Sequence, residues 1–367
     1  MTPPDTSSAG GSTSDDLENL PLVPLMDLAN ARFDGDDEGG GGSTSPSSEA
    51  AMAVRGQATE VESWLLALAS QPVVPDPPEL VQHSSQTVFR MFRSWPRMLA
   101  KGIQLPPIVH FLQFREGAPR PLANCITLCK MWAGQAEDSA QIVEDAVRTE
   151  VESILAKYHT YDAPTLLAAT QSIVILMLVL LFPSRWQSSI SVVPLPLFAQ
   201  LQQMAYHVLS TGTALQEEEQ NVHGRQRPLL PPPSWCVWAH VEAKRRAIQA
   251  LYFLYWAYSV YHGSRHFNCL ELGRMLAPGP RFLWQATDEA TWRGLYIKWL
   301  AQWNEEGGTP GLLQAEFFLV QRGPVMDRRA EMWLDDADEL GILMLSIVNA
   351  SQRDLSQIPG PVDDRIG

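Results

Sequence analysis

The chain has 367 residues, of which 45% are hydrophobic, which is enough for one large folded domain or two smaller ones. Its formal net charge is −14 and its sequence pI is about 5.0. This charge argues against autonomous nucleic-acid binding, because a basic face normally supplies most of the non-specific affinity. Four scattered cysteines and no apolar N-terminal signal segment predict a reducing compartment, either the cytosol or the nucleus.

The excess acidity lies in the N-terminal part of the chain. Residues 1–56 hold ten acidic and two basic residues, a net charge of −8. Because a stretch rich in Ser, Gly, Thr, Pro and Asp cannot bury enough apolar surface to order itself, we predict a disordered acidic tail over residues 1–57. Within it, residues 15–38 mix carboxylates with leucines, which is typical of activation segments that contact a partner. The alternative is a tail that only solubilises the protein.

The organisation after the tail follows from the spacing of apolar residues. A short amphipathic helix is predicted over residues 58–69, and it ends at a Pro-rich linker over residues 72–78. We therefore expect a short helix and linker over 58–79, one folded domain over 80–350, and a flexible C-terminal tail over 351–367.

Almost every periodic segment of the domain predicts a helix. The predicted helices are 85–100, 124–132, 139–158, 165–182, 194–211, 238–261, 287–303, 312–319 and 328–348. No alternating apolar run is long enough to indicate a sheet. The expected fold class is all-α, a single multi-helix domain preceded by the disordered acidic tail.

One predicted helix raises the question of a membrane span. Residues 173–182 are ten consecutive apolar residues, and the helix around them covers eighteen. A transmembrane helix needs about twenty predominantly apolar residues, whereas ten to fourteen more often indicate a buried core helix. Polar residues occupy its first half and Pro183 ends it. We therefore predict a central helix that is buried on all sides.

A series of short motifs runs through the domain in a fixed order. They are Phe92–Leu99 (FRSWPRML), Leu105–His110 (LPPIVH), Pro121–Cys125 (PLANC), Leu166–Gln171 (LLAATQ), Ser234–Arg246 (SWCVWAHVEAKRR), Leu276–Pro278 (LAP) and Leu283–Ala286 (LWQA). The most specific of them reads Trp-x-x-Trp-x-x-x-Glu-x-x-Arg-Arg. Together they resemble the middle, regulatory region of fungal transcription factors, whose members usually carry an N-terminal binuclear zinc cluster or zinc fingers.

The sequence departs from this family in its cysteines. A binuclear zinc cluster needs six thiolates within about thirty residues, whereas this chain has Cys125, Cys129, Cys236 and Cys269. The resemblance therefore implies a transcriptional co-regulator of a fungal pathway, such as a secondary-metabolite gene cluster. These 367 residues contain no zinc-based DNA-binding module.

The partners and location follow from the same resemblance. We expect a nuclear protein that binds a DNA-binding transcription factor or the transcription machinery. It would make no direct contact with nucleic acid and none with a membrane, and a small-molecule effector is left open. The alternative is a cytosolic ligand-sensing or scaffold protein with no role in transcription.

Physical reasoning first gives the motif residues structural roles. Glu242 and Arg246 are four residues apart on one predicted helix, in the favoured order for an ion pair. Such a pair stabilises by only a few tenths of a kcal/mol, about 0.3–0.5, when it is exposed. Lys244 and Arg245 are expected to contact neighbouring helix ends or to face solvent. Four tryptophans are expected to be core or rim residues: Trp235, Trp238, Trp284 and Trp292.

Enzyme signatures are missing from the sequence. It has no G-x-S-x-G elbow, H-E-x-x-H motif, Walker A loop or dinucleotide fingerprint, and we predict no catalytic, cofactor-binding or metal-binding residue. His262 and His266 are four residues apart and Cys269 follows them, a set that could hold a metal ion, but Gly263 favours a loop that ends a helix. The C-x3-C pair, Cys125 and Cys129, is interpreted as buried thiols.

Overall fold

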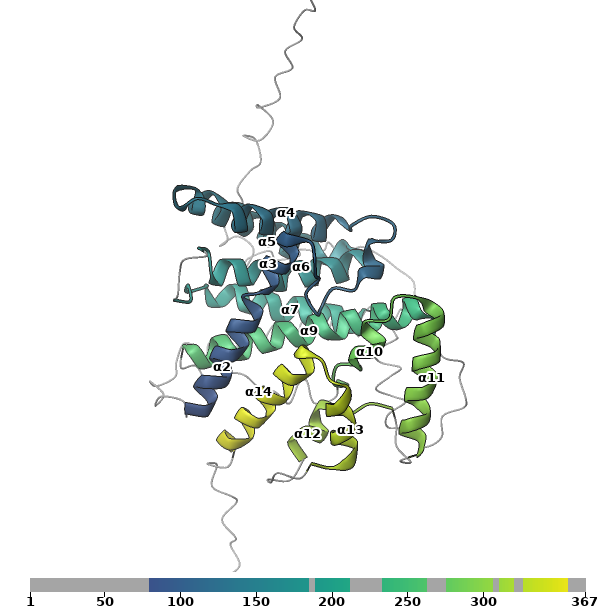
Figure 1. The fold of residues 1–367 in the computed structure, drawn as a ribbon. Helices are drawn as coiled ribbons and strands as arrows, with labels where there is room; N and C mark the ends of the chain where they lie inside the picture. The colour runs from purple at the N-terminus through teal and green to yellow at the C-terminus, as the bar shows by residue number, and fades with distance from the viewer. Residues whose placement is uncertain are drawn as a thin grey trace, which may run out of the picture. The chain divides into compact units, whose positions relative to one another are not determined.

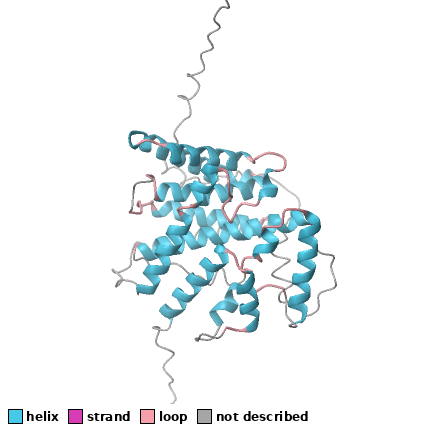
Figure 2. Cartoon of the chain, viewed as in Figure 1, coloured by secondary structure: helices cyan, strands magenta, loops and turns pink. Residues whose placement is uncertain are grey.

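The computed structural model describes residues 79–184, 189–211, 233–262, 275–305, 310–319 and 326–355. The predicted tail, the predicted helix over 58–69 and the final residues from 356 lie outside the described part. Of the described residues 77% are helical and none belongs to a strand, so the all-α fold class is confirmed (Figure 2).

The described part of the chain begins with α2 (Glu79–Phe92), α3 (Trp95–Lys101) and α4 (Arg120–Gly134). The prediction of one helix over 85–100 is wrong, because the chain turns at Arg93 and Ser94. Ser94 donates from its backbone N–H to the carbonyl of Met91, and its hydroxyl donates to the same oxygen at 2.6 Å. Pro96 then lies in the first turn of α3, where a residue without an N–H is tolerated.

The middle of the chain forms α5 (Ala140–Lys157), α6 (Ala163–Leu181), α7 (Leu195–Ser210) and α9 (Trp235–Tyr261). Asp162 begins α6 as its N-cap by accepting the N–H of Thr165 at 3.0 Å. By length and composition α6 is apolar enough to cross a membrane, but 89% of it is buried inside the fold. Every residue from Leu166 to Leu181 is buried, as predicted for a central core helix.

The last helices are α10 (Arg281–Trp284), α11 (Glu289–Glu305), α12 (Gln314–Leu319), α13 (Arg328–Asp336) and α14 (Glu339–Leu355). The single helix predicted over 328–348 is wrong, because it is broken at Ala337 and Asp338. One Asp338 carboxylate oxygen accepts the N–H groups of Leu340 and Gly341 at 3.1 and 3.2 Å, which starts a new helix.

The helices stack around α9, which is 27 residues long and runs through the middle of the fold (Figure 1). On one side α6 and α7 pack on α9, and α4 and α5 cover α6. On the other side α2 and α14 pack on α9 and on each other. Because neighbours surround it, α9 is buried on nearly every face, including positions that carry charge.

Candidate functional site

Helix α9 directs a group of charged side chains into the interior. Glu242 and Arg246 are fully buried, and Lys244 and Arg245 are 8% and 4% exposed. Isolated charges cannot stay in such surroundings, because burial without a partner costs several kcal/mol or shifts the pKa. These four buried side chains and the groups that they contact therefore form the candidate functional site.

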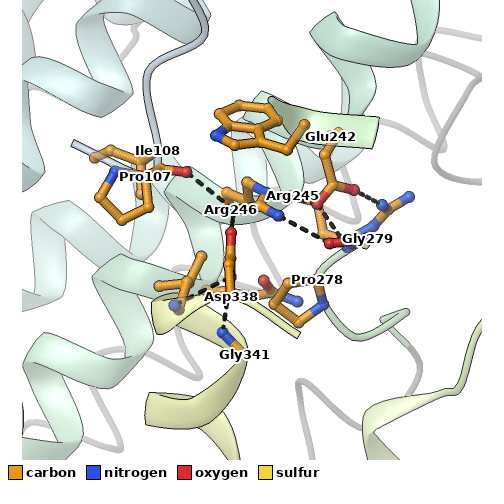
Figure 3. A network of polar contacts seen from close by, with 12 residues as sticks. Pro107, Ile108, Glu242, Arg245, Arg246, Pro278, Gly279, Asp338 and Gly341 are labelled. Atoms are coloured by element: carbon orange, nitrogen blue, oxygen red, sulfur yellow. Dashed lines mark hydrogen bonds and ion pairs between the residues drawn. The ribbon is translucent and has the colours of Figure 1, made fainter. Parts of the chain in front are cut away.

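Arg246 lies at the centre of this place (Figure 3). Its Nε donates to Glu242 Oε1 at 2.6 Å, and its Nη1 donates to the carboxylate of Asp338 and to the carbonyl of Pro107 at 3.2 Å. Its Nη2 donates to the carbonyl of Gly279 at 2.9 Å. The guanidinium also lies 4.3 Å from the ring centroid of Trp284, a cation–π contact.

Glu242 completes the network. Its Oε2 accepts from Arg245 Nη1, and its Oε1 also accepts the backbone N–H of Gly279 at 2.7 Å. Burial by itself would raise the pKa of Glu242, but the charges of Arg245 and Arg246 outweigh it and the pKa is lowered. Burial likewise acts to lower the pKa of Arg246, while Asp338 and Glu242 raise it. Glu242 and Arg246 are therefore held in their charged forms, and the network brings two guanidinium groups together with two carboxyl groups.

The charge network joins four separate parts of the chain. Arg246 comes from α9, Pro107 from the connection after α3, Gly279 from the segment before α10, and Asp338 from the junction of α13 and α14. Space is tight at Gly279, since a Cβ there would lie 3.2 Å from two atoms of the Glu242 carboxylate and would force that carboxylate to shift. The arrangement fixes how these segments meet and leaves no carboxylate or guanidinium of the network facing solvent.

An aromatic cluster lies beside the network. It consists of the buried residues Trp235, Trp238, Trp284, Trp292 and Tyr296. Trp292 stacks on Tyr296 with 4.7 Å between ring centroids and lies 5.7 Å from Trp238. The prediction that the four tryptophans are core or rim residues is confirmed.

His110 connects this cluster to the loop before α4. Its Nδ1 accepts the N–H of Leu112 at 3.3 Å, so the proton resides on Nε2, which donates to the carbonyl of Trp284 at 3.1 Å. Burial lowers the pKa of His110 to about 4, so the ring is neutral at physiological pH. A second proton would face the Leu112 N–H, and protonation is therefore incompatible with this contact.

The predictions for the charged residues have different outcomes. The Glu242–Arg246 ion pair is confirmed, but it is buried rather than exposed. Lys244 contacts a helix end, as expected: its Nζ donates to the carbonyl of Thr211, the C-cap residue of α7. Burial lowers the pKa of Lys244 to about 8. Arg245 does not face solvent, because it is buried and pairs with Glu242.

The cysteine and histidine predictions are tested in part. Cys125 and Cys129 are buried, as predicted, and Cys236 is exposed. Helix α9 ends at Tyr261 with His262 as its C-cap, whereas His266 and Cys269 lie outside the described residues. Among described residues, no three His, Cys, Asp or Glu side chains are grouped so as to hold a metal ion.

Sequence reasoning predicted Glu242 as a partner of Arg246 but missed the other three, Asp338, Pro107 and Gly279. An aspartate before an apolar run is a helix-start signal, and Asp338 precedes such a run, but the helical periodicity on both sides concealed it. Pro107 and Gly279 contribute backbone carbonyls, which no side-chain pattern records. Searches for similar proteins found no matching family model, curated protein or solved structure.

Proposed function

We propose that this protein is a transcriptional co-regulator of a fungal pathway, such as a secondary-metabolite gene cluster. The proposal rests on the ordered motifs that resemble the regulatory region of fungal zinc-cluster and zinc-finger factors. Because the printed sequence lacks the cysteine spacing of a zinc cluster, the protein would act in the nucleus through a DNA-binding factor or the transcription machinery.

The observation that carries the proposal is that motifs distant in sequence meet at Arg246. Pro107 belongs to the LPPIVH motif, Trp284 belongs to the LWQA motif, and Gly279 directly follows the LAP motif. Glu242 and Arg246 belong to the most specific motif of the series. Short motifs that jointly build one buried network are expected when a resemblance reflects a shared fold.

The test combines transcript profiling after gene deletion with chromatin occupancy of the tagged protein. We expect transcripts of one set of neighbouring genes to collapse. Occupancy at their promoters should disappear when a zinc-cluster regulator is removed. Unchanged transcripts together with no chromatin signal would refute a role in transcription.

The alternative, a cytosolic ligand-sensing or scaffold protein, is favoured by two atoms of the aromatic cluster. Trp235 Nε1 and Trp292 Nε1 are buried and have no hydrogen-bond partner among the described residues. Buried indole N–H groups usually find an acceptor, so an apolar ligand with an acceptor oxygen would satisfy them. Under this alternative, deletion leaves transcripts unchanged, and binding of such a ligand changes tryptophan fluorescence in the wild type but less in Trp292→Phe.

A further inference from the structure

Basic residues are concentrated in one part of this acidic protein. Residues 80–136 hold seven basic residues and one acidic residue, a net charge of +6 in a chain whose net charge is −14. The segment forms most of α2 together with α3 and α4. Its basic residues are Arg90, Arg93, Arg97, Lys101, Arg115, Arg120 and Lys130.

Four of these residues form a stripe along α2 and α3. Arg93, Arg97 and Lys101 follow one another at spacings of four residues along α3 and the turn before it, and Arg90 lies in the last turn of α2. Arg97 Nε lies 3.4 Å from the carbonyl of Arg93. Burial and the charge of Arg97 both lower the pKa of Arg93. Arg90, Arg97 and Lys101 are exposed.

Helix α4 packs against α3 and adds further exposed residues. The Arg93 guanidinium lies 5.1 Å from the ring centroid of Phe182, and the carbonyl of Phe182 accepts from Trp132 Nε1 at 2.9 Å. Phe182 thereby links Arg93 to Trp132 in the last turns of α4. Lys130 and Met131, which precede Trp132, are both exposed.

The exposed cations of this surface are not neutralised within the described part of the chain. The ion pairs found there include exposed ones on other helices, such as Arg148 with Glu144 and Arg293 with Glu289, but none involves Arg90, Arg97, Lys101 or Lys130. Ile103, two residues after Lys101, is 88% exposed. The surface therefore combines unpaired positive charge with apolar side chains.

We propose that this surface binds an acidic, leucine-rich segment of a partner protein. We call it the basic face and define it by Arg90, Arg97, Lys101, Ile103, Lys130 and Met131. Its cations complement carboxylates, and Ile103 and Met131 can contact the apolar side chains between them. A nucleic acid fits less well, because the chain as a whole carries −14 and would repel a polyanion. The inference does not depend on any role in transcription.

The test measures binding of a fluorescent peptide by the full-length protein. The probe has about twenty residues in which Asp and Glu alternate with Leu and Phe, and a control peptide carries Lys in place of the acids. The test variant is Arg90→Glu, Arg97→Glu and Lys101→Glu. Its matched control is Arg293→Glu and Lys298→Glu on exposed positions of α11. Circular dichroism and the thermal midpoint report whether each variant is folded.

We expect the charge-reversed basic face to bind the acidic peptide at least about tenfold more weakly, and the α11 control to bind like the wild type. Because a charge reversal could disturb α2 and α3, the neutral variant Arg90→Gln, Arg97→Gln and Lys101→Gln is measured as well, with an expected loss of about threefold. Wild-type binding should weaken as salt rises from about 0.05 to about 0.3 M, since exposed charges are screened.

Three results would overturn the inference. The first is equal peptide affinity for wild type and both basic-face variants. The second is equal affinity of the wild type for the acidic and the Lys-containing peptide. The third is tighter, face-dependent binding of duplex DNA or of phosphatidylserine vesicles, which would assign the surface to a different class of partner.

Discussion

Asp338 offers the sharpest test of the buried charge network, because its carboxylate has two separable tasks. One oxygen pairs with Arg246 and the other accepts the N–H groups that begin α14. Asp338→Asn keeps the size of the side chain and an oxygen that can cap the helix, but it removes the charge. Asp338→Ala removes both.

The magnitudes follow from burial. The Arg246 side chain is fully buried and that of Asp338 is 2% exposed, so water cannot compensate either charge. Removing one partner of a buried ion pair costs about 3–5 kcal/mol, because the remaining charge is left uncompensated. We expect Asp338→Asn to destabilise the protein by about 3 kcal/mol, since the amide still accepts one hydrogen bond. Asp338→Ala should cost about 1 kcal/mol more through the lost helix cap.

The assay is urea unfolding followed by tryptophan fluorescence, with stability taken from the midpoint at unchanged slope. A double-mutant cycle with Arg246→Met should give a coupling of about 2–3 kcal/mol, because either single variant already breaks the pair. Glu289→Gln is the matched control: its exposed pair with Arg293 should contribute less than about 0.5 kcal/mol. The reasoning is refuted if Asp338→Asn unfolds within about 0.5 kcal/mol of the wild type while Asp338→Ala loses only the cap energy.

Three further predictions use titration and space. Burial lowers the pKa of His110 to about 4, so its contribution to stability should be complete above pH 6.5. The free energy of unfolding should then fall by about 3 kcal/mol as the pH drops through 4. Urea unfolding at a series of pH values checks this, and His110→Gln should show no such loss. Burial lowers the pKa of Lys244 to about 8, so the wild type should gain up to about 3 kcal/mol relative to Lys244→Met as pH rises from 8 to 10.5, and a pH-independent difference would contradict this. Gly341→Ala should lower the thermal midpoint although Gly341 lies in a helix, because the new Cβ would lie 3.0 Å from the Trp333 ring. Gly294→Ala on α11 is the control: its Cβ would meet open space, and it should stabilise the protein by about 1 kcal/mol.

Helical periodicity predicted most of the fold, because it records which face of each helix is buried. It gave α5, α6 and α7 nearly to their ends and identified α6 as a core helix. It failed at Ser94 and at Asp338, where the residues on both sides continue the helical pattern. The interruption at each place comes from hydrogen bonds of one polar side chain, and a pattern averaged over several turns does not resolve that event.

The candidate site was predicted less completely, for a related reason. The spacing of Glu242 and Arg246 indicated their ion pair, but charged residues four apart usually lie on a solvated face. Burial of the pair depends on Asp338, which is 92 residues away from Arg246, and on two backbone carbonyls. Long-range pairing of this kind leaves no periodic trace, so the sequence alone could not distinguish a surface pair from a buried network.

The backbone carbonyls also bear on why a charged residue occupies the centre of the fold. A simple buried ion pair can often be replaced by apolar residues at no cost, or even with a gain in stability. Arg246 differs, because its guanidinium also satisfies the carbonyls of Pro107 and Gly279. An apolar residue at position 246, even together with neutral partners at 242 and 338, would leave these two buried acceptors without that donor, at about 1–3 kcal/mol each. The network is therefore held in place by backbone geometry as well as by charge. A fold that brings these two connections against α9 needs a planar, multidentate donor at this position, and arginine is the side chain that provides one.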